Sequence, residues 1–345
     1  MTAPTQTVAA DEALPKLRTD LVPIYLLLGL SLLALPLIIY YGDSSASTWA
    51  TLTIAGLAMG MMLFIMSSGL TLVFGLMDVM NFGHGAFIAV GAYTGSIVFR
   101  SMNSWMEADS FWLNISAIGI AILVAMLVTA VVGWLYERLF IKPVYGNPLM
   151  QILMTTGAMI VVEQLIIVIW GPDLIPLQIP TTLQGSFILG DVIVEKYRLT
   201  AVIIGLAVFI GMYMVLNRTR VGLLIRAGVE NGEMVQALGY RIRRLFIGVF
   251  VSGAALAALG GVMWGLYKQE LTSSIGGQVF VSILIVIIIG GMGSVGGCFI
   301  AALMVSLLAN YAGFLAPKIA LVTEILLMVA VLSWRPQGLY PVSSH

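Results

Sequence analysis

The chain has 345 residues and no net formal charge, and 60% of its residues are hydrophobic while only 9% are charged. Its mean hydropathy is +1.05. This composition excludes an ordinary soluble domain, which carries far more charge. The zero net charge gives no reason to expect nucleic-acid binding, and the single cysteine, Cys298, cannot form an internal disulfide. We expect an all-α, polytopic membrane protein.

The apolar residues fall into ten runs, most of them long enough to cross about 30 Å of hydrocarbon as helices. The runs cover residues 21–41, 50–77, 82–100, 111–136, 149–170, 199–216, 245–267, 279–290, 298–315 and 319–334. A single transmembrane domain is therefore expected over 21–335, with residues 1–20 as a disordered cytoplasmic tail and 336–345 as a second cytoplasmic tail. Because the turns at 78–81 and 291–297 could be crossings or re-entrant, eight to ten transmembrane helices are predicted.

The lysines and arginines predict the orientation, because cytoplasmic loops carry an excess of them. With ten alternating spans and a cytoplasmic N-terminus, eleven of these residues near the spans lie inside and five lie outside. The inside group is Lys16, Arg18, Arg138, Lys142, Arg218, Arg220, Arg226, Arg241, Arg243, Arg244 and Arg335, and the outside group is Arg100, Lys196, Arg198, Lys268 and Lys318. Both termini are therefore predicted to be cytoplasmic.

Two apolar runs meet at residues 78–85, a short polar and glycine-containing stretch that we call the first break. Lipid cannot satisfy open backbone groups, so such a break is tolerated only against protein or a wet cavity. We therefore expect a translocation path here. The candidate residues are Asp78, Asn81, Phe82, His84 and Gly85. With no second histidine in the spans, a metal site is not expected, and a structural hydrogen bond to the broken backbone is favoured over a catalytic role for His84.

A second break, residues 290–297, consists largely of glycine. Its candidate gating and packing residues are Gly290, Gly291, Gly293, Gly296 and Gly297. No Lys-Ser or Lys-Thr follows them, so this is not a phosphate-binding loop, and no cofactor is expected in this chain. Close helix packing through small residues is the simpler interpretation. The two breaks together suggest an internal repeat with two broken hairpins facing one cavity.

Two connections are long. Residues 171–198 are rich in proline and glycine and are predicted to form an extracytoplasmic loop with a short strand pair around Gly190. Residues 217–244 are basic and predicted to be cytoplasmic, with a short helix over 227–238 that Gly239 ends. This helix could dock into a soluble subunit, or the segment could be a solvated basic loop. The residues assigned to docking are Arg226, Ala227, Glu230, Met234, Ala237, Leu238 and Gly239.

Carboxylates within the spans offer a different class of function. Glu163, Glu324 and Asp78 are costly in a bilayer and by default face the bundle interior or water. For each, a structural role is favoured over transport, because three isolated carboxylates without a histidine or lysine chain do not form a convincing proton relay. A stand-alone, ion-coupled carrier using Glu163 or Glu324 remains the alternative.

Four stretches carry a resemblance to a known family. They are residues 75–87 with 91–93, Arg226-Ala with Ala237-Leu-Gly239, residues 290–297, and the ending Arg335-Pro-Gln-Gly-Leu339. Together they resemble the integral-membrane permeases of ATP-driven importers for branched-chain amino acids, in which two homologous permeases pair.

The resemblance implies several partners and a location in the bacterial inner membrane. The partners are a second permease, two ATP-binding subunits that hold ATP and Mg, and a periplasmic solute-binding protein. The helix over 227–239 corresponds to the coupling helix, although Glu230 and Ala237 are too widely separated for a strict Glu-Ala-Ala pattern. The implied cargo is leucine, isoleucine or valine, with urea, short amides and organic carboxylates as alternatives, and a homodimer of permeases remains possible.

Overall fold

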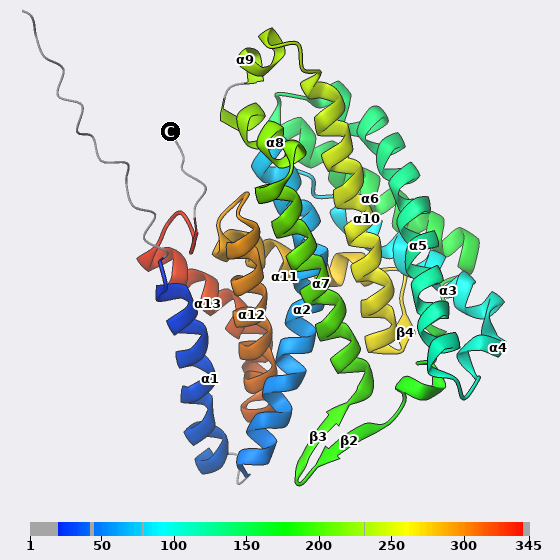
Figure 1. Ribbon diagram of the computed structural model, residues 1–345, viewed down its shortest axis with the longest axis vertical. Helices are drawn as coiled ribbons and strands as arrows, with labels where there is room; N and C mark the ends of the chain where they lie inside the picture. Colours follow the sequence, from blue (N-terminus) through cyan, green and yellow to red (C-terminus); the bar gives the residue numbers. More distant parts are fainter. Residues whose placement is uncertain (1–19, 42–44, 78, 231, 341–345) are drawn as a thin grey trace, which may run out of the picture.

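The computed structural model of the chain describes residues 20–41, 45–77, 79–230 and 232–340, and these fold mainly into helices (Figure 1). The first half contains α1 (Val22–Tyr41), α2 (Ala46–Met77), α3 (His84–Ser101), α4 (Asn103–Met106), α5 (Phe111–Tyr136), the π-helical turn η1 (Glu137–Ile141), the 3-10 turn η2 (Lys142–Val144) and α6 (Pro148–Trp170). The loop that follows contains β1 (Ile175–Pro176), the 3-10 turn η3 (Thr181–Leu183), β2 (Ser186–Leu189) and β3 (Val192–Glu195).

The second half begins with a long helix and contains the second break, residues 290–297. It contains α7 (Lys196–Arg218), α8 (Arg220–Glu230), α9 (Gly232–Ala237), α10 (Ile242–Lys268), β4 (Glu270–Leu271), α11 (Ile275–Gly290), α12 (Val295–Leu315), the 3-10 turn η4 (Pro317–Ile319) and α13 (Ala320–Trp334). Each of the ten predicted apolar runs therefore overlaps a helix. The expected all-α, polytopic fold is confirmed.

The helices differ in whether they can cross a bilayer alone. Among the described residues, seven are long and apolar enough to do so: α1, α2, α5, α6, α7, α10 and α12. The others among the ten, α3, α11 and α13, are shorter. With 16 residues, α11 rises only about 24 Å, less than the hydrocarbon thickness of about 30 Å. Of these short helices, α3 follows the first break and α11 precedes the second.

Helix α2 forms the centre of the bundle and packs against α7, α10 and α12. Small residues permit this close packing: a Cβ placed on Gly69 would lie 2.3 Å from the carbonyl oxygen of Gly253, and one on Gly60 would lie 3.0 Å from the Cα of Leu303. In lipid, where helices gain little from the hydrophobic effect on association, such contacts provide the van der Waals packing that holds them together.

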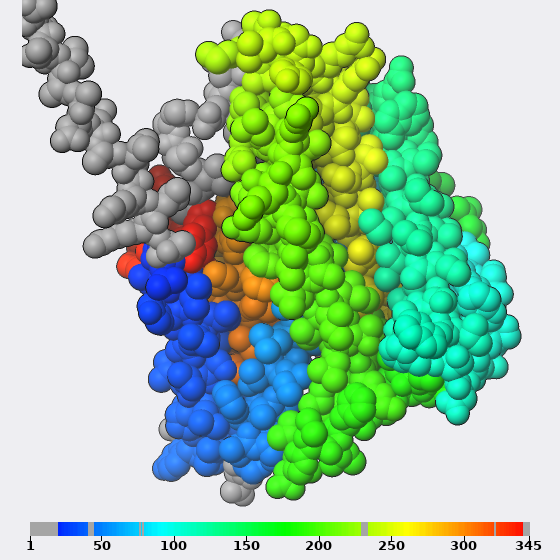
Figure 2. Space-filling model, viewed as in Figure 1, coloured from blue at the N-terminus to red at the C-terminus, as the bar shows by residue number. Residues whose placement is uncertain are grey.

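The outer helices expose apolar side chains. Leu33 of α1 and Val168 of α6 are 69% and 80% exposed. In the space-filling view, α1 lies at one edge of the molecule and α4 and α5 lie at the other (Figure 2). Such surfaces are expected where the solvent is lipid or where another membrane subunit packs.

The two long connections lie at opposite ends of the bundle, with the β2–β3 hairpin at one end and α8 and α9 at the other (Figure 1). Strands β2 and β3 pair antiparallel, with Ile188 opposite Ile193, so the predicted strand pair around Gly190 is confirmed. The helical pattern of residues 217–244 was predicted less well. Helix α8 already begins at Arg220, whereas the sequence indicated a helix only from residue 227.

Candidate functional site

The first break is held by a polar stripe on α6. After α2, residues 79–83 are not helical, and α3 begins at His84. The side-chain oxygen of Gln151 accepts a hydrogen bond from the amide of Met80 at 3.0 Å, and Thr155 Oγ1 accepts one from the amide of Phe82 at 3.0 Å. Residues 151 and 155 share one helix face because they are four apart. The open backbone is thus satisfied by protein, as burial in a membrane requires.

The turn into α3 is packed beneath an aromatic ring. Asn81 Oδ1 accepts a hydrogen bond from the Gly83 amide at 3.0 Å, while the buried Nδ2 of Asn81 has no hydrogen-bond partner among the described residues. The hydroxyl of Tyr136 donates to the Thr155 carbonyl at 3.0 Å. A Cβ on Gly83 would lie 1.8 Å from that hydroxyl, so the ring of Tyr136 requires glycine at this position.

His84 fastens the start of α3 to the middle of α2. Its Nε2 donates a hydrogen bond to the carbonyl oxygen of Met66 at 2.9 Å, and its side chain is buried. The ring also meets the edge of Phe87, with 6.0 Å between centroids. The sequence favoured a hydrogen bond from His84 to the broken backbone, whereas the acceptor is instead a carbonyl of α2, because α3 starts alongside that helix.

The two halves of the chain meet beside the first break. Gly85 and Gly276 pack so closely that a Cβ on Gly85 would lie 2.8 Å from the Gly276 carbonyl oxygen, which places the first turns of α3 and α11 together. The ring of Phe82 meets that of Phe280 edge-on, with 5.7 Å between centroids. The carboxylate of Glu163, also on the face of α6 that bears Thr155, lies beside Gly277. Of the candidate residues, Phe82 and Gly85 therefore lie against α11. Asn81 and His84 instead bond within the break and to α2, and Asp78 lies outside the described residues.

The second break is a tight turn between α11 and α12. Gly291 ends α11 with φ +93°, a conformation that L side chains rarely adopt. Ser294 Oγ accepts the amide of Gly297 at 3.1 Å and so caps α12. A Cβ on Gly297 would lie 1.9 Å from the carbonyl oxygen of Gly290, whereas one on Gly296 meets nothing within 4 Å. Gly293 lies against Gly75 at the end of α2.

Residues 336–340 pack against the second break. The amides of Leu339 and Tyr340 donate to the carbonyls of Ile289 and Gly290 at 2.8 and 3.1 Å. Leu339 is buried, and Gly338 packs against Gly291. This part of the segment predicted as a tail, 336–345, therefore folds back onto α11, because the last carbonyls of that helix need donors. The ending Arg335-Pro-Gln-Gly-Leu339 was noted in the sequence for its family resemblance, but no local pattern in it indicated this contact.

An ion pair joins this segment to the start of α1. Arg335 Nη1 lies 2.5 Å from Asp20 Oδ2, and the hydroxyl of Tyr340 donates to the Asp20 carbonyl at 2.5 Å. The hydrogen bond from Arg335, followed by that from the amide of Val22, lowers the pKa of Asp20 below its ordinary value of 3.8. A depressed folded-state pKa means that the contact stabilises the fold above pH 3.8 and is lost as pH falls through the folded-state value.

We predict that Asp20→Asn at pH 7 increases hydrogen exchange at the amides of Leu339 and Tyr340, because it removes the charge that holds Arg335. Lowering the pH of the unsubstituted chain through the folded-state pKa of Asp20 should have the same effect, once intrinsic exchange rates are corrected. Asp173→Asn, at an exposed loop position, is the control and should change neither amide. Equal exchange at pH 7 in the unsubstituted chain, Asp20→Asn and Asp173→Asn would show that the ion pair of Asp20 with Arg335 does not hold this segment.

The predicted docking segment is exposed at the end of the bundle opposite the hairpin. Met234 and Leu238 are 61% and 71% exposed, and Ala237 is the exposed last residue of α9. Gly239 has φ +88°, and the amide of Tyr240 donates to the Val235 carbonyl at 3.2 Å, which is the predicted glycine-ended helix terminus.

Three other members of the predicted docking set lie on α8. Arg226 donates to the Asn217 side chain at 3.4 Å, and Ala227 is half-buried. Glu230 is the last residue of α8, and its side chain is not among those that the structure describes. The predicted docking set is thus divided between α8 and α9 instead of lying on one helix.

The two described intramembrane carboxylates, Glu163 and Glu324, contact different parts of α11. Glu324 of α13 accepts a hydrogen bond from Ser282 of α11 at 2.8 Å, whereas Glu163 lies beside the first turn of α11. Within the described residues, neither carboxylate forms an ion pair, and no group of three or more histidine, cysteine, aspartate or glutamate side chains is arranged to hold a metal ion. Glu163 and Glu324 are thus not joined to each other by any hydrogen bond found among the described residues.

Comparisons with known proteins identify the family. The profile described as branched-chain amino acid transport system / permease component matches residues 52–332. Permease protein BraD of the high-affinity branched-chain amino acid transport system of Pseudomonas aeruginosa is 26% identical over 291 residues, which cover 82% of this chain and 93% of the relative. LivH of Escherichia coli K12, named as a permease protein of the same kind of system, is 25% identical over 291 residues, covering 82% and 92%. A probable branched-chain amino acid transport permease protein LivH of Methanocaldococcus jannaschii is 26% identical over 297 residues, covering 81% and 88%. No solved structure gives a significant match. The chain therefore belongs to the family of permease components of branched-chain amino acid transport systems.

Proposed function

We propose that this chain is the membrane-spanning subunit of an ATP-binding-cassette importer, and that it provides the translocation path for branched-chain amino acids or a related small polar solute. The observation that carries this proposal is the family match over residues 52–332, which includes both breaks and the segment 217–244. The partners are a second permease, two ATP-binding subunits and a periplasmic solute-binding protein. The setting is a bacterial inner membrane with both termini cytoplasmic.

The path is proposed to run beside the first break, where α3 and α11 begin. Two helix N-termini carry partial positive charge, which favours the carboxylate of an amino acid. Phe82 is partly exposed, and so is Glu163 on the adjacent face of α6. Asn81 and His84 are buried, so in this conformation they hold the broken backbone in place. Movement of α11 against α12 at the second break, between its gating glycines, would then open or close the path.

ATP hydrolysis by the partner subunits is proposed to be coupled to the translocation path through α8 and α9. ATP-driven closure of the ATP-binding subunits would move these helices and switch the path between outward and inward access. The exposed apolar side chain of Leu238 provides the kind of surface that seats in a groove on a soluble subunit.

We predict that Leu238→Asp reduces the affinity for the ATP-binding subunits at least tenfold, about 1.4 kcal/mol, because it places a charge in an apolar contact. Co-purification and uptake should both fall, while the folded yield stays unchanged because the side chain is exposed. Leu189→Asp at the tip of the β2–β3 hairpin, 69% exposed, is the matched control and should retain the ATP-binding subunits. Unchanged association in Leu238→Asp would exclude this coupling surface.

The experiment that tests the proposed function is ATPase activity of the co-purified complex in lipid nanodiscs, with and without its binding protein loaded with one candidate solute at a time. Stimulation by leucine, isoleucine or valine supports the importer and identifies its cargo. Stimulation only by urea, an amide or another carboxylate would also support the importer but would identify that solute as the cargo. Gradient-driven uptake by the chain alone, abolished by Glu163→Gln or Glu324→Gln, would favour the ion-coupled carrier instead.

A further inference from the structure

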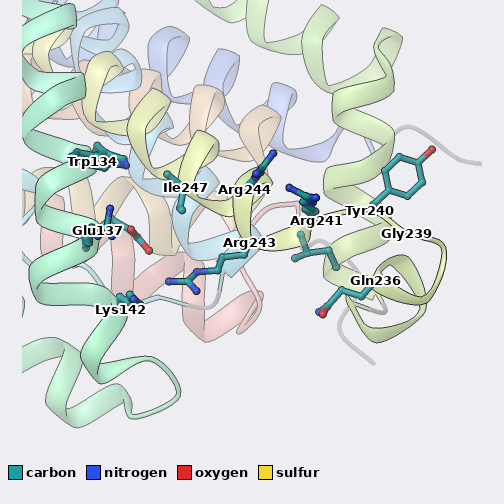
Figure 3. Close-up of a pocket in the computed structure, with 12 residues that line it drawn as sticks. Trp134, Glu137, Lys142, Gln236, Gly239, Tyr240, Arg241, Arg243, Arg244 and Ile247 are labelled. Atoms are coloured by element: carbon teal, nitrogen blue, oxygen red, sulfur yellow. The ribbon is translucent and has the colours of Figure 1, made fainter.

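A basic cavity of about 720 Å³ lies where α5 ends and α10 begins, at the same end of the bundle as α9 (Figures 1 and 3). One wall comes from the last turn of α5 with η1 and η2. The other wall comes from the segment after α9 and the first turns of α10. Figure 3 shows Arg243 extending from α10 toward Glu137 and Lys142 on the opposite wall. The cavity volume falls within the range of small-molecule sites in proteins.

The charge of this cavity is strongly unbalanced. Its cationic lining residues are Arg138, Lys142, Arg241, Arg243 and Arg244. Among the side chains that the structure describes, Glu137 is the one carboxylate that lines it. Among side chains that the structure describes, none of the five cations forms an ion pair, since the two pairs found involve other residues. Five cations around one space repel one another, so an anion with several acceptor oxygens would stabilise them through charge-assisted hydrogen bonds.

The cavity lies at the end of a membrane-spanning helix. Trp134, in the last turn of the membrane-spanning helix α5, lines it and is 41% exposed, and tryptophan prefers the boundary between hydrocarbon and headgroups. The guanidinium of Arg138 lies over the Trp134 ring, 5.5 Å from its centroid. Ile247 of α10 provides an apolar wall. A ligand here would have its anionic group among the cations and an apolar part beside Trp134 and Ile247.

We propose that this cavity binds the phosphate headgroup of an anionic phospholipid from the adjacent leaflet. Basic pockets between membrane helices on the cytoplasmic side suit such headgroups, because that leaflet is anionic. Arg138 and Lys142 belong to the α5 wall, whereas Arg241 and Arg243 follow α9, so one phosphate bridges the two walls. The bound headgroup therefore holds the segment after α9 against the membrane-embedded part of the chain. This binding does not depend on the cargo or on the partners proposed above.

The test uses the full chain in nanodiscs of phosphatidylcholine with or without phosphatidylglycerol. The chain is then released into detergent, and its bound lipids are counted by native mass spectrometry. We expect phosphatidylglycerol to be retained in preference to phosphatidylcholine. The double variant Lys142→Gln/Arg243→Gln should reduce the affinity for phosphatidylglycerol about tenfold. The matched control, Arg218→Gln/Arg220→Gln, removes two exposed cations that do not line the cavity and should retain the lipid.

Three outcomes would overturn the proposal. The first is equal loss of phosphatidylglycerol in the two double variants. The second is displacement of the lipid by inorganic phosphate at equal concentration, which would indicate a free-anion site. The third is loss of co-purifying ATP-binding subunits from Lys142→Gln/Arg243→Gln with lipid retention unchanged, which would make the cavity a protein interface. Because all these variants change exposed side chains, their folded yield, measured by size-exclusion chromatography, should match that of the unsubstituted chain.

Discussion

Gly297→Ala is expected to destabilise the folded chain by about 1–3 kcal/mol, the usual cost of overpacking a core. The added Cβ would lie 1.9 Å from the carbonyl oxygen of Gly290, a backbone atom that can move only if α11 and α12 separate. The measurement is the midpoint of thermal unfolding in detergent, followed by size-exclusion chromatography. Because this contact adjoins the segment 336–340, hydrogen exchange at the Leu339 amide should also increase.

Gly296→Ala is the matched control for this prediction. The two glycines are adjacent in the first turn of α12, but a Cβ on Gly296 meets nothing within 4 Å. Alanine there should leave stability unchanged or raise it by up to about 1 kcal/mol, because alanine has the higher helix propensity. If the two variants unfolded at the same temperature, the close contact of Gly290 with Gly297 would not be a determinant of stability.

The second large effect is expected at Thr155. Thr155→Val preserves the shape of the side chain but removes Oγ1, which accepts the hydrogen bond from the Phe82 amide. A buried amide left without an acceptor costs about 1–3 kcal/mol. We expect the thermal midpoint to fall and solute uptake to decrease, because the first break loses one of the two hydrogen bonds that α6 provides to it.

Thr129→Val tests the same substitution without this loss. Thr129 is also buried in a membrane helix, yet its hydroxyl has no hydrogen-bond partner among the described residues. Removing an unsatisfied hydroxyl should therefore be neutral or stabilising. A loss of stability at Thr129 as large as that at Thr155 would mean that shape, rather than the hydrogen bond to Phe82, determines the effect.

Hydropathy and turn chemistry predicted much of this fold. Each of the ten apolar runs overlaps a helix, because the length of a membrane helix is set by the bilayer and is visible in sequence. Gly190 and Gly239 correctly indicated a hairpin and a helix end, because both depend on local backbone conformation. Helix α8 was missed before residue 227 because its basic residues resemble those of a solvated loop.

The contacts that hold the two breaks could not be predicted from local patterns. Gln151 and Thr155 are four residues apart in an apolar helix, and that spacing was the available signal for a polar stripe. Their partners, however, are backbone amides about 70 residues away, which no local rule identifies. For His84 the sequence indicated a hydrogen bond to the broken backbone, but the ring instead donates to the carbonyl of Met66 in α2. Long-range packing, and not residue type, determines these partners.

The contact between residues 335–340 and α11 also bears on the order of synthesis. Helices α11 and α12 leave the ribosome before Leu339 and Tyr340, so the carbonyls of Ile289 and Gly290 lack these donors when the two helices first insert. The hydrogen bonds that Leu339 and Tyr340 donate to α11 can therefore form only after both helices have been synthesised. A shortened chain that stops at Trp334 would contain every helix that the structure describes and still lack these hydrogen bonds, whereas a fusion placed after residue 340 would preserve them.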